Sequence, residues 1–194
     1  SRELGLPRNQ SYTHYADLKR PFVVWNVFAA PTLSVELKKW CFIQAGCISY
    51  RGYFSQEDAI RYANNLEKQG HDVYVGGVRA YSTLGWFDDP VLNTFTDYAE
   101  LELARLMFHE LAHQVVYVPG DSMFNESFAT AVEYEGVMRW SKQHGTVIDQ
   151  ATLNTEQEVD TIFAELALKH RKQLHTVFTS EISDAEKYAG KKRI

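Results

Sequence analysis

The segment that most constrains this chain is an apolar run from about Thr96 to Val116 that contains His109-Glu110-Leu111-Ala112-His113. Its apolar residues recur at helical spacing, so we expect a largely interior helix that is broken by Pro119-Gly120. Residues four apart share one face of a helix, and both imidazoles can therefore bind the same ion. A surface helix is the alternative, but the apolar neighbours oppose it, and buried imidazoles need partners. The run therefore predicts a metal ion or a polar network.

Glu110 follows the first of these histidines directly, where its carboxylate can reach a water bound to the same ion. This is the spacing used by zinc peptidases, in which the Glu is the general base. Catalytic zinc is normally held by three protein ligands. A third ligand is therefore expected elsewhere in the chain.

Glu126 is the predicted third ligand, at the start of a helix expected over residues 125–143 that the preceding turn brings back beside the first. Glu133, two turns along the same face, is predicted to accept the outer N–H of a ligating histidine. Two alternatives stay open. Glu126 can be a first-turn carboxylate favoured by the helix dipole. Asp121 is a competing ligand, although its place after Pro-Gly is typical of a turn residue.

The first half of the chain has the pattern of β-structure and the second half that of helices. Strands are predicted over residues 21–31, over 40–50 with an end at Arg51-Gly52, and over 71–77 with a stop at Gly76-Gly77. Helices are predicted from Ser55 as N-cap to Gly70, over 125–143, and over 155–178 with one apolar face, namely Val159, Ile162, Phe163, Leu166, Leu174 and Val177.

This order predicts an α+β fold in one domain over residues 1–194. A small mixed or antiparallel sheet with a helix occupies about residues 1–90, and a helical half with the paired histidines and Glu126 occupies about 91–194. The chain opens without Met or a leader, and residues 185–194 have the pattern of the charged start of an unfinished helix. We therefore expect a chain trimmed at both ends.

Composition excludes several classes of protein. A hydrophobic fraction of 45% and an aromatic fraction of 13% are enough for a sizeable core and rule out a disordered chain. The net charge of −5 gives no general attraction for a polyanion, so nucleic acid is not an expected partner. No apolar run approaches the roughly 20 residues that span a bilayer.

Two further features are ambiguous from the residues alone. Cys41 and Cys47 lack the spacing of a zinc ribbon, and they can close a small disulfide loop or remain two buried thiols. Tyr81 lies in a loop after a predicted strand, where functional side chains are often presented, and is a candidate donor to a reaction oxyanion. A tyrosine packed at a core edge fits its position equally well.

Taken together, these residues resemble the gluzincin pattern of metallopeptidases, which is HExxH, then NExxA, then a helical Glu. Within that clan the chain is most similar to the predicted zinc aminopeptidase family of Gram-negative bacteria. The likeness is carried by His109 to His113, Asn125-Glu126-Ser127-Phe128-Ala129, Glu133, and the segments 6–12, 24–31, 41–47 and 80–90. The gap from His113 to Glu126 is shorter than in the best-known gluzincin peptidases, which weakens any transfer of their substrate-binding details.

The resemblance implies a zincin-like fold and one Zn²⁺ per chain, bound by His109, His113 and Glu126. It implies Glu110 as general base in the hydrolysis of peptide substrates, and the family label adds removal of residues from their amino end. Members of the family carry an export or lipoprotein signal. This implies a periplasmic or membrane-anchored location, a tether through an N-terminal segment absent here, and a disulfide between Cys41 and Cys47. Two alternatives remain: a zinc amidase acting on cell-wall peptides, and a scaffold with structural zinc. Oligomeric state is not predicted.

Overall fold

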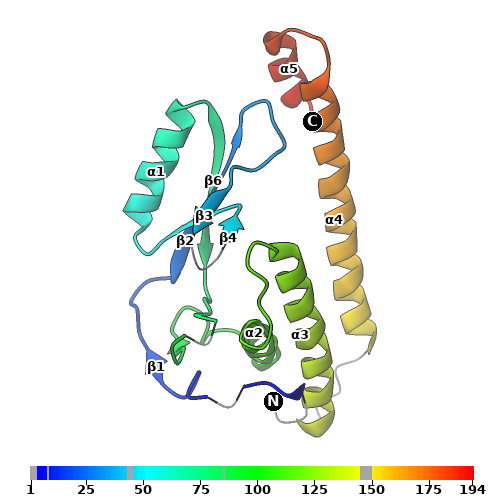
Figure 1. Ribbon diagram of the computed structural model, residues 1–194. Helices are drawn as coiled ribbons and strands as arrows, with labels where there is room; N and C mark the ends of the chain where they lie inside the picture. The colour runs from blue at the N-terminus through cyan, green and yellow to red at the C-terminus, as the bar shows by residue number, and fades with distance from the viewer. Residues whose placement is uncertain (1–3, 8, 43–45, 85, 145–149) are drawn as a thin grey trace.

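The structure is a computed structural model that describes residues 4–7, 9–42, 46–84, 86–144 and 150–194, of which 144, 150–154, 156 and 157 are described by their backbone alone. Its elements in chain order are β1 (Tyr15–Ala16), β2 (Val24–Pro31), β3 (Trp40–Phe42), β4 (Gly46–Ile48), β5 (Arg51–Tyr53), α1 (Gln56–Lys68), β6 (His71–Val78), β7 (Val91–Leu92), α2 (Glu100–His113), α3 (Ser122–His144), α4 (Gln150–Thr179) and α5 (Asp184–Lys191). Strands precede the main helices along the chain, and the predicted α+β class is confirmed (Figure 1).

The main sheet has the strand order β5-β2-β6 and is antiparallel. Central strand β2 pairs with β6 along its whole length, from Val24 opposite Val78 to Pro31 opposite His71. Alternate residues of β2 are buried, because successive side chains of a strand point to opposite faces. The predicted strand over 21–31 is therefore confirmed, with its first three residues outside β2.

Helix α1 covers one face of this sheet (Figure 1). Trp25, Val27 and Ala29 of β2 pack against three buried residues of the helix, which are Ala59, Ala63 and Leu66. Ser55 caps α1 as predicted, since its side chain accepts a hydrogen bond from the backbone N–H of Asp58. This layer forms one of two hydrophobic clusters among the described residues, and it is the one with more fully buried residues.

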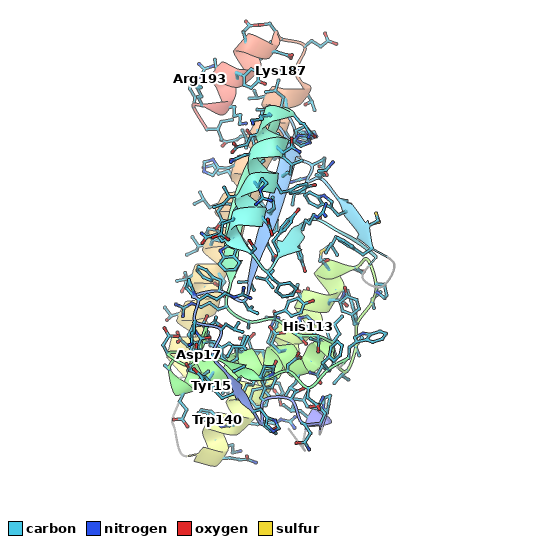
Figure 2. The ribbon with its side chains drawn as sticks, turned by 90° about the vertical axis from the view of Figure 1, so that its left-hand side faces the viewer. Tyr15, Asp17, His113, Trp140, Lys187 and Arg193 are labelled. Atoms are coloured by element: carbon cyan, nitrogen blue, oxygen red, sulfur yellow. A yellow bond between two sulfur atoms is a disulfide. The ribbon has the colours of Figure 1, made fainter. Side chains whose placement is uncertain are left out.

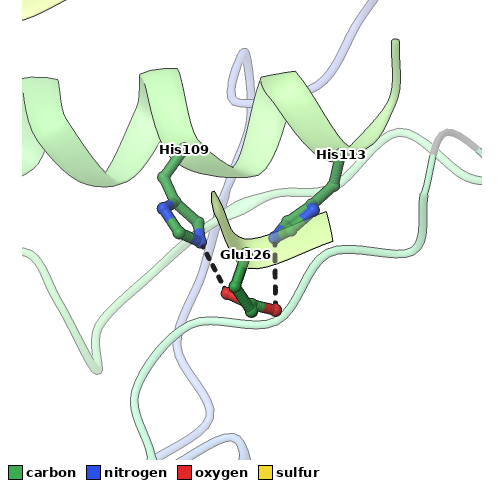
Figure 3. A group of neighbouring side chains, drawn as sticks. All are labelled: His109, His113 and Glu126. Carbon is green, nitrogen blue, oxygen red and sulfur yellow. Dashed lines mark hydrogen bonds and ion pairs between the residues drawn. The ribbon is translucent and has the colours of Figure 1, made fainter. Parts of the chain in front are cut away.

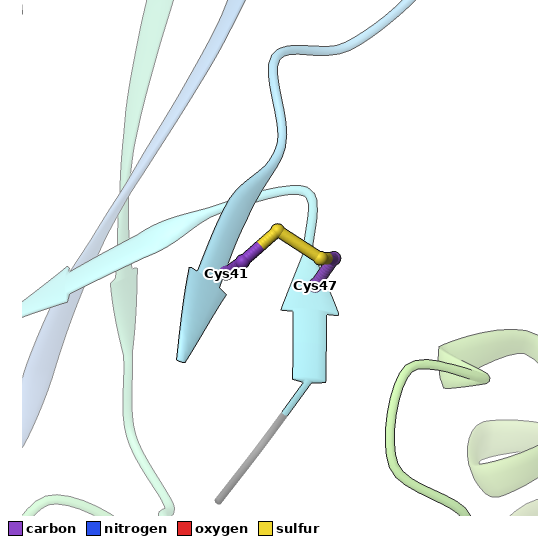
Figure 4. Close-up of a disulfide and its surroundings, with 2 residues drawn as sticks. All are labelled: Cys41 and Cys47. Atoms are coloured by element: carbon purple, nitrogen blue, oxygen red, sulfur yellow. A yellow bond between two sulfur atoms is a disulfide. The ribbon is translucent and has the colours of Figure 1, made fainter. Parts of the chain in front are cut away.

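The region predicted as a single strand over residues 40–50 is instead the hairpin β3–β4, in which Cys41 lies opposite Cys47. Residues 43–45 lie outside the described residues. Cys41 and Cys47 form a disulfide across the hairpin (Figure 4). The disulfide implied by the family resemblance is thus confirmed, and it joins the two strands that carry the cleft residues Phe42 and Ile48.

Glycines predicted to end strands lie inside them. Gly52 belongs to β5 and pairs with Asn26, while Gly76 and Gly77 belong to β6. A Cβ atom at Gly77 would lie 2.4 Å from the ring of Phe22. A glycine at this position therefore allows an aromatic ring to pack on the strand.

A second cluster joins the sheet to the helical half. Val23, Val24, Leu92 and Phe95 form its buried centre. Leu103 and Leu106 of α2 pack against it. The parallel pair β1–β7 places the segment around Leu92 beside the N-terminal residues. In Figure 2, His113 lies below the strands of the main sheet. This cluster therefore holds α2 beneath the end of the sheet.

Helix α2 ends at His113, so Val115 and Val116, which were predicted to belong to this helix, lie beyond its end. Two β-branched residues and the approaching proline disfavour its continuation. Most of its residues are half-buried, and only Ala112 and His113 are fully buried, which is less than the predicted interior position.

Helix α3 packs along α2, and Gly136 marks the point of close approach. A Cβ atom on Gly136 would lie 2.5 Å from the ring of Phe108 in α2. Helix α3 begins at Ser122, three residues before the prediction, because the Asp121 carboxylate accepts the backbone N–H of Phe124 at 3.0 Å. Asp121 is thus a helix cap, as expected of a residue in this turn.

Helix α4 is long, and the short helix α5 folds back beside its C-terminal end (Figure 1). Helix α4 begins at Gln150, five residues before the prediction, and the face predicted to be apolar is exposed at Val159, Ile162, Phe163 and Leu166. Helix α5 is capped by Ser183, and the Lys191 ammonium donates to Asp72 and to the Thr32 carbonyl oxygen. None of the helices in the described part of the chain combines the length and apolar character needed to cross a membrane.

Replacing Gly136 with alanine is expected to destabilise the protein by about 1–3 kcal/mol, because Phe108 must move away from a well-packed position. Helix propensity alone predicts the opposite sign, a gain of about 1 kcal/mol. Urea denaturation followed by circular dichroism measures the difference. Lys142→Ala, at an exposed position of the same helix, is the control and should change stability by less than about 0.5 kcal/mol. A stabilised Gly136→Ala variant would contradict the close approach.

Candidate metal centre and cleft

His109 and His113 lie one turn apart on α2, with ring centroids 4.9 Å from each other. Glu126 of α3 faces both rings (Figure 3). Its Oε2 lies 3.3 Å from Nε2 of His109, and its Oε1 lies 3.8 Å from Nε2 of His113. One ligand atom from each residue lies within 4.8 Å of the other two. The three side chains therefore form a group that could hold a metal ion.

Asn125 explains how Glu126 reaches this position. Its side chain is buried and makes two hydrogen bonds to Val118, accepting from the backbone N–H at 2.8 Å and donating to the carbonyl oxygen at 2.9 Å. These bonds close the turn between α2 and α3. In the sequence Asn125 stands out only as part of a motif, whereas in the structure its two hydrogen bonds to Val118 hold the start of the chain segment that carries Glu126.

Glu133 lies behind His109, on the side away from Glu126. Its Oε2 is 3.2 Å from Nδ1 of His109, and its other oxygen is 4.0 Å from Nε of Arg105. A carboxylate on the outer nitrogen of a histidine fixes the ring orientation and leaves Nε2 free to bind an ion. This is the placement that the spacing of seven residues from Glu126 suggested.

The two carboxylates around His109 favour positive charge. Hydrogen bonds to Glu126 and Glu133 raise the pKa of His109 to about 10, so the imidazolium donates from both nitrogens. The bond from His109 in turn lowers the pKa of Glu126. A protonated His109 therefore places a positive charge between the two carboxylates. A divalent ion could instead be bound by the Nε2 atoms of His109 and His113 and by the carboxylate of Glu126.

His113 is buried, and burial lowers its pKa, which keeps the imidazole neutral as a metal ligand must be. Within the described part of the chain, its Nδ1 is buried without a hydrogen-bond partner. The side chain is held by its position in the helix rather than by a carboxylate such as the one beside His109.

Glu110 lies in a less polar environment than Glu126. Burial raises its pKa to about 7, although the nearby His109 opposes the shift. A carboxyl group with this pKa can both accept and return a proton near neutral pH. Glu110 lines the same cleft as the three candidate ligands.

The cleft has a volume of about 440 Å³ and lies between the end of the sheet and α2. Tyr81 lines it and is half exposed, so the structure brings this predicted residue to the site. Tyr50 and Tyr117 also line it and were not singled out from the sequence. Tyr117 comes four residues after His113, and that proximity was the available signal.

Other charged residues near the cleft have partners outside it. Arg79 pairs with Asp97 at 3.1 Å and does not line the cleft. Glu102 accepts the backbone N–H of Ala99 and so caps α2. Within the described residues, the only carboxylates lining the cleft belong to Glu110 and Glu126.

Comparison with known proteins gives one match. The model of a family described as "Putative aminopeptidase" matches residues 1–194, and the chain belongs to this family. No curated protein and no solved structure matches the chain. The family description indicates a peptidase, and hence a hydrolase that acts on peptides.

We expect the purified, tag-free protein to bind one divalent ion per chain and Glu126→Ala to lose most of it, because the variant lacks the carboxylate that faces both imidazoles. Mass spectrometry of the metal content measures the stoichiometry. Glu135→Ala is the matched control, since Glu135 lies on the same helix and pairs with Arg139 outside the site. Full metal content in Glu126→Ala would exclude Glu126 as a ligand.

Glu133→Gln should weaken metal affinity by about 10–100-fold, because it removes the negative charge that orients His109. Competition with a chromophoric chelator gives the dissociation constant. Glu135→Gln should leave that constant unchanged. Equal affinities for Glu133→Gln and the wild type would mean that Glu133 plays no part in holding the ligand.

Proposed function

We propose that the protein is a zinc-dependent peptidase of the gluzincin type, with His109, His113 and Glu126 as metal ligands and Glu110 as general base. The observation that carries this proposal is the convergence of the three candidate ligands with the half-buried Glu110 in one cleft. Two imidazoles and one carboxylate are a common ligand set of catalytic zinc. The family description supports peptide substrates, including the possibility of an aminopeptidase.

Zinc bound by these three residues would supply a Lewis acid that polarises a carbonyl and acidifies water. Glu110 accepts the proton of the attacking water and returns it to the leaving amine, for which a pKa near 7 is suitable. The phenolic O–H of Tyr81 donates a hydrogen bond to the oxyanion of the tetrahedral intermediate and keeps its proton. Glu133 keeps Nδ1 of His109 occupied and so directs Nε2 toward the ion.

The open side of the centre favours an enzyme over a scaffold. Structural zinc sites normally have four protein ligands, whereas catalytic sites keep a position free. Three candidate ligands gather here, beside a cleft of about 440 Å³. A scaffold has no use for a carboxyl group buried beside the ligands.

A periplasmic location is part of the proposal. Disulfides persist in oxidising compartments and are rare in the cytosol. The Cys41–Cys47 disulfide supports an exported protein. We propose that the protein acts in the periplasm, either free or held at the membrane by an N-terminal anchor.

Glu110→Gln should retain zinc and lower kcat for peptide hydrolysis by about 10²–10⁴-fold, because the amide cannot accept the proton of the attacking water. The assay follows cleavage of a peptide mixture by mass spectrometry, with metal content measured in parallel. Each peptide is supplied with a free and with an acetylated amino end. Cleavage of the free form alone indicates an aminopeptidase, and cleavage of both indicates an endopeptidase.

Glu57→Gln is the control, because this exposed glutamate lies on α1 away from the cleft. It should cleave as the wild type does. Equal rates for Glu110→Gln and the wild type would rule out Glu110 as the base. Hydrolysis that survives complete removal of the metal would rule out the metal mechanism.

A further inference from the structure

A second cleft of about 620 Å³ adjoins the candidate metal centre. The two clefts share five lining residues, namely Tyr81, Ser82, Leu84, His113 and Tyr117. The second cleft extends from these toward Trp86 and Phe87. Apart from His113, none of the described residues that line it has an ionisable acidic or basic group of the Asp, Glu, Lys, Arg or His type. It is therefore an uncharged extension of the candidate active site.

The loop that forms one wall of this cleft is held by its own hydrogen bonds. The buried Asp89 carboxylate accepts the backbone N–H of Thr83 at 3.1 Å. The Thr83 hydroxyl accepts the backbone N–H of Phe87 and donates to its carbonyl oxygen. Asp89 is joined to the N-terminal segment through a hydrogen bond from its backbone N–H to Ser11. Thr83, Phe87 and Asp89 are thus held to one another by hydrogen bonds.

This loop presents two neighbouring aromatic side chains to solvent. Trp86 and Phe87 are each 74% exposed. Large aromatic groups contribute most of their stabilisation when buried, and adjacent exposed ones beside a cleft are typical of a binding surface. Holding them on a preformed loop lowers the entropy lost when an apolar group binds between them.

We propose that this loop forms a specificity subsite, in which Trp86 and Phe87 bind a large apolar side chain of the peptide substrate next to the scissile bond. His113 lines both clefts, so a side chain in the second cleft lies beside the candidate metal ligands. Among the described residues, none that line the second cleft is an Asp, Glu, Lys or Arg, so a charged side chain would lose its hydration without gaining an ion-pair partner of these types. Peptides with Phe or Leu next to the scissile bond are therefore the preferred substrates.

The proposal rests on the proposed function, and the test separates the two. The probes are peptides of one constant Gly/Ser frame with a single variable residue, which is Phe, Leu, Ala or Glu. We compare wild type with Trp86→Ala/Phe87→Ala, with the conservative Trp86→Phe, and with Phe163→Ala. The last is the matched control, because Phe163 is 71% exposed but lies on α4.

Wild type should cleave the Phe peptide with a kcat/KM at least about tenfold above that of the Ala and Glu peptides. The double variant should lose most of this preference through a higher KM, with little change for the Ala peptide. Trp86→Phe should keep most of the preference, and Phe163→Ala all of it. Unchanged melting temperatures exclude a general loss of folding.

Binding is measured separately by calorimetry with zinc-loaded Glu110→Gln, alone and combined with the double substitution. If peptides are cleaved but the preference is absent, or survives in the double variant, the subsite is overturned and the peptidase stands. If nothing is cleaved but the Phe peptide binds selectively through Trp86 and Phe87, the subsite stands and the peptidase proposal fails. If no peptide is cleaved or bound, both are overturned.

Discussion

The packing of α3 against α2 is the contact on which the candidate site depends. His109 and His113 come from one helix and are placed by its repeat alone, but Glu126 belongs to another element. Phe108 lies against the bare backbone of Gly136, which lets the helices approach, and Asn125 closes the turn between them. A larger residue at Gly136 would separate the carboxylate from the imidazoles. The geometry of the site is therefore a property of helix packing and not only of the ligands.

The charges around His109 show why this packing favours a cation. Glu133 contacts Nδ1 of His109 and Glu126 contacts Nε2 of the same ring. Without an ion, the two carboxylates keep both ring nitrogens of His109 protonated. A bound cation would replace that proton at Nε2, while Glu133 would remain on Nδ1. His113 differs, since burial keeps it neutral and no carboxylate lies within hydrogen-bond distance of its Nδ1 among the described residues. The helix therefore supplies one imidazole that is already neutral, His113, and one whose Nε2 proton a bound ion would have to displace, His109.

Local patterns in the sequence predicted the parts of the structure that depend on local geometry. The i, i+4 histidines, the Ser55 cap and the spacing from Glu126 to Glu133 follow from the helical repeat. The β3–β4 hairpin was missed because only cross-strand pairing of Cys41 with Cys47 separates it from one continuous strand. Gly77 was misinterpreted for a similar reason, since the Phe22 ring that requires a glycine there comes from a distant segment. Tyr50 and Tyr117 belong to the cleft through tertiary contacts that no spacing encodes.

Burial and charge are divided between the two clefts. Burial raises the pKa of Glu110 in the first cleft, which gives this carboxyl group the proton affinity that a general base needs near neutral pH. Among the described residues, the Asp, Glu, Lys, Arg and His side chains that line the first cleft are the candidate ligands and Glu110. The second cleft, which Glu110 does not line, offers a charged substrate side chain no charged partner other than His113, and it extends the aromatic surface to Trp86 and Phe87. Substrate preference at Trp86 and Phe87 is therefore separate from the proton affinity of Glu110, and the two properties meet only at the residues that line both clefts.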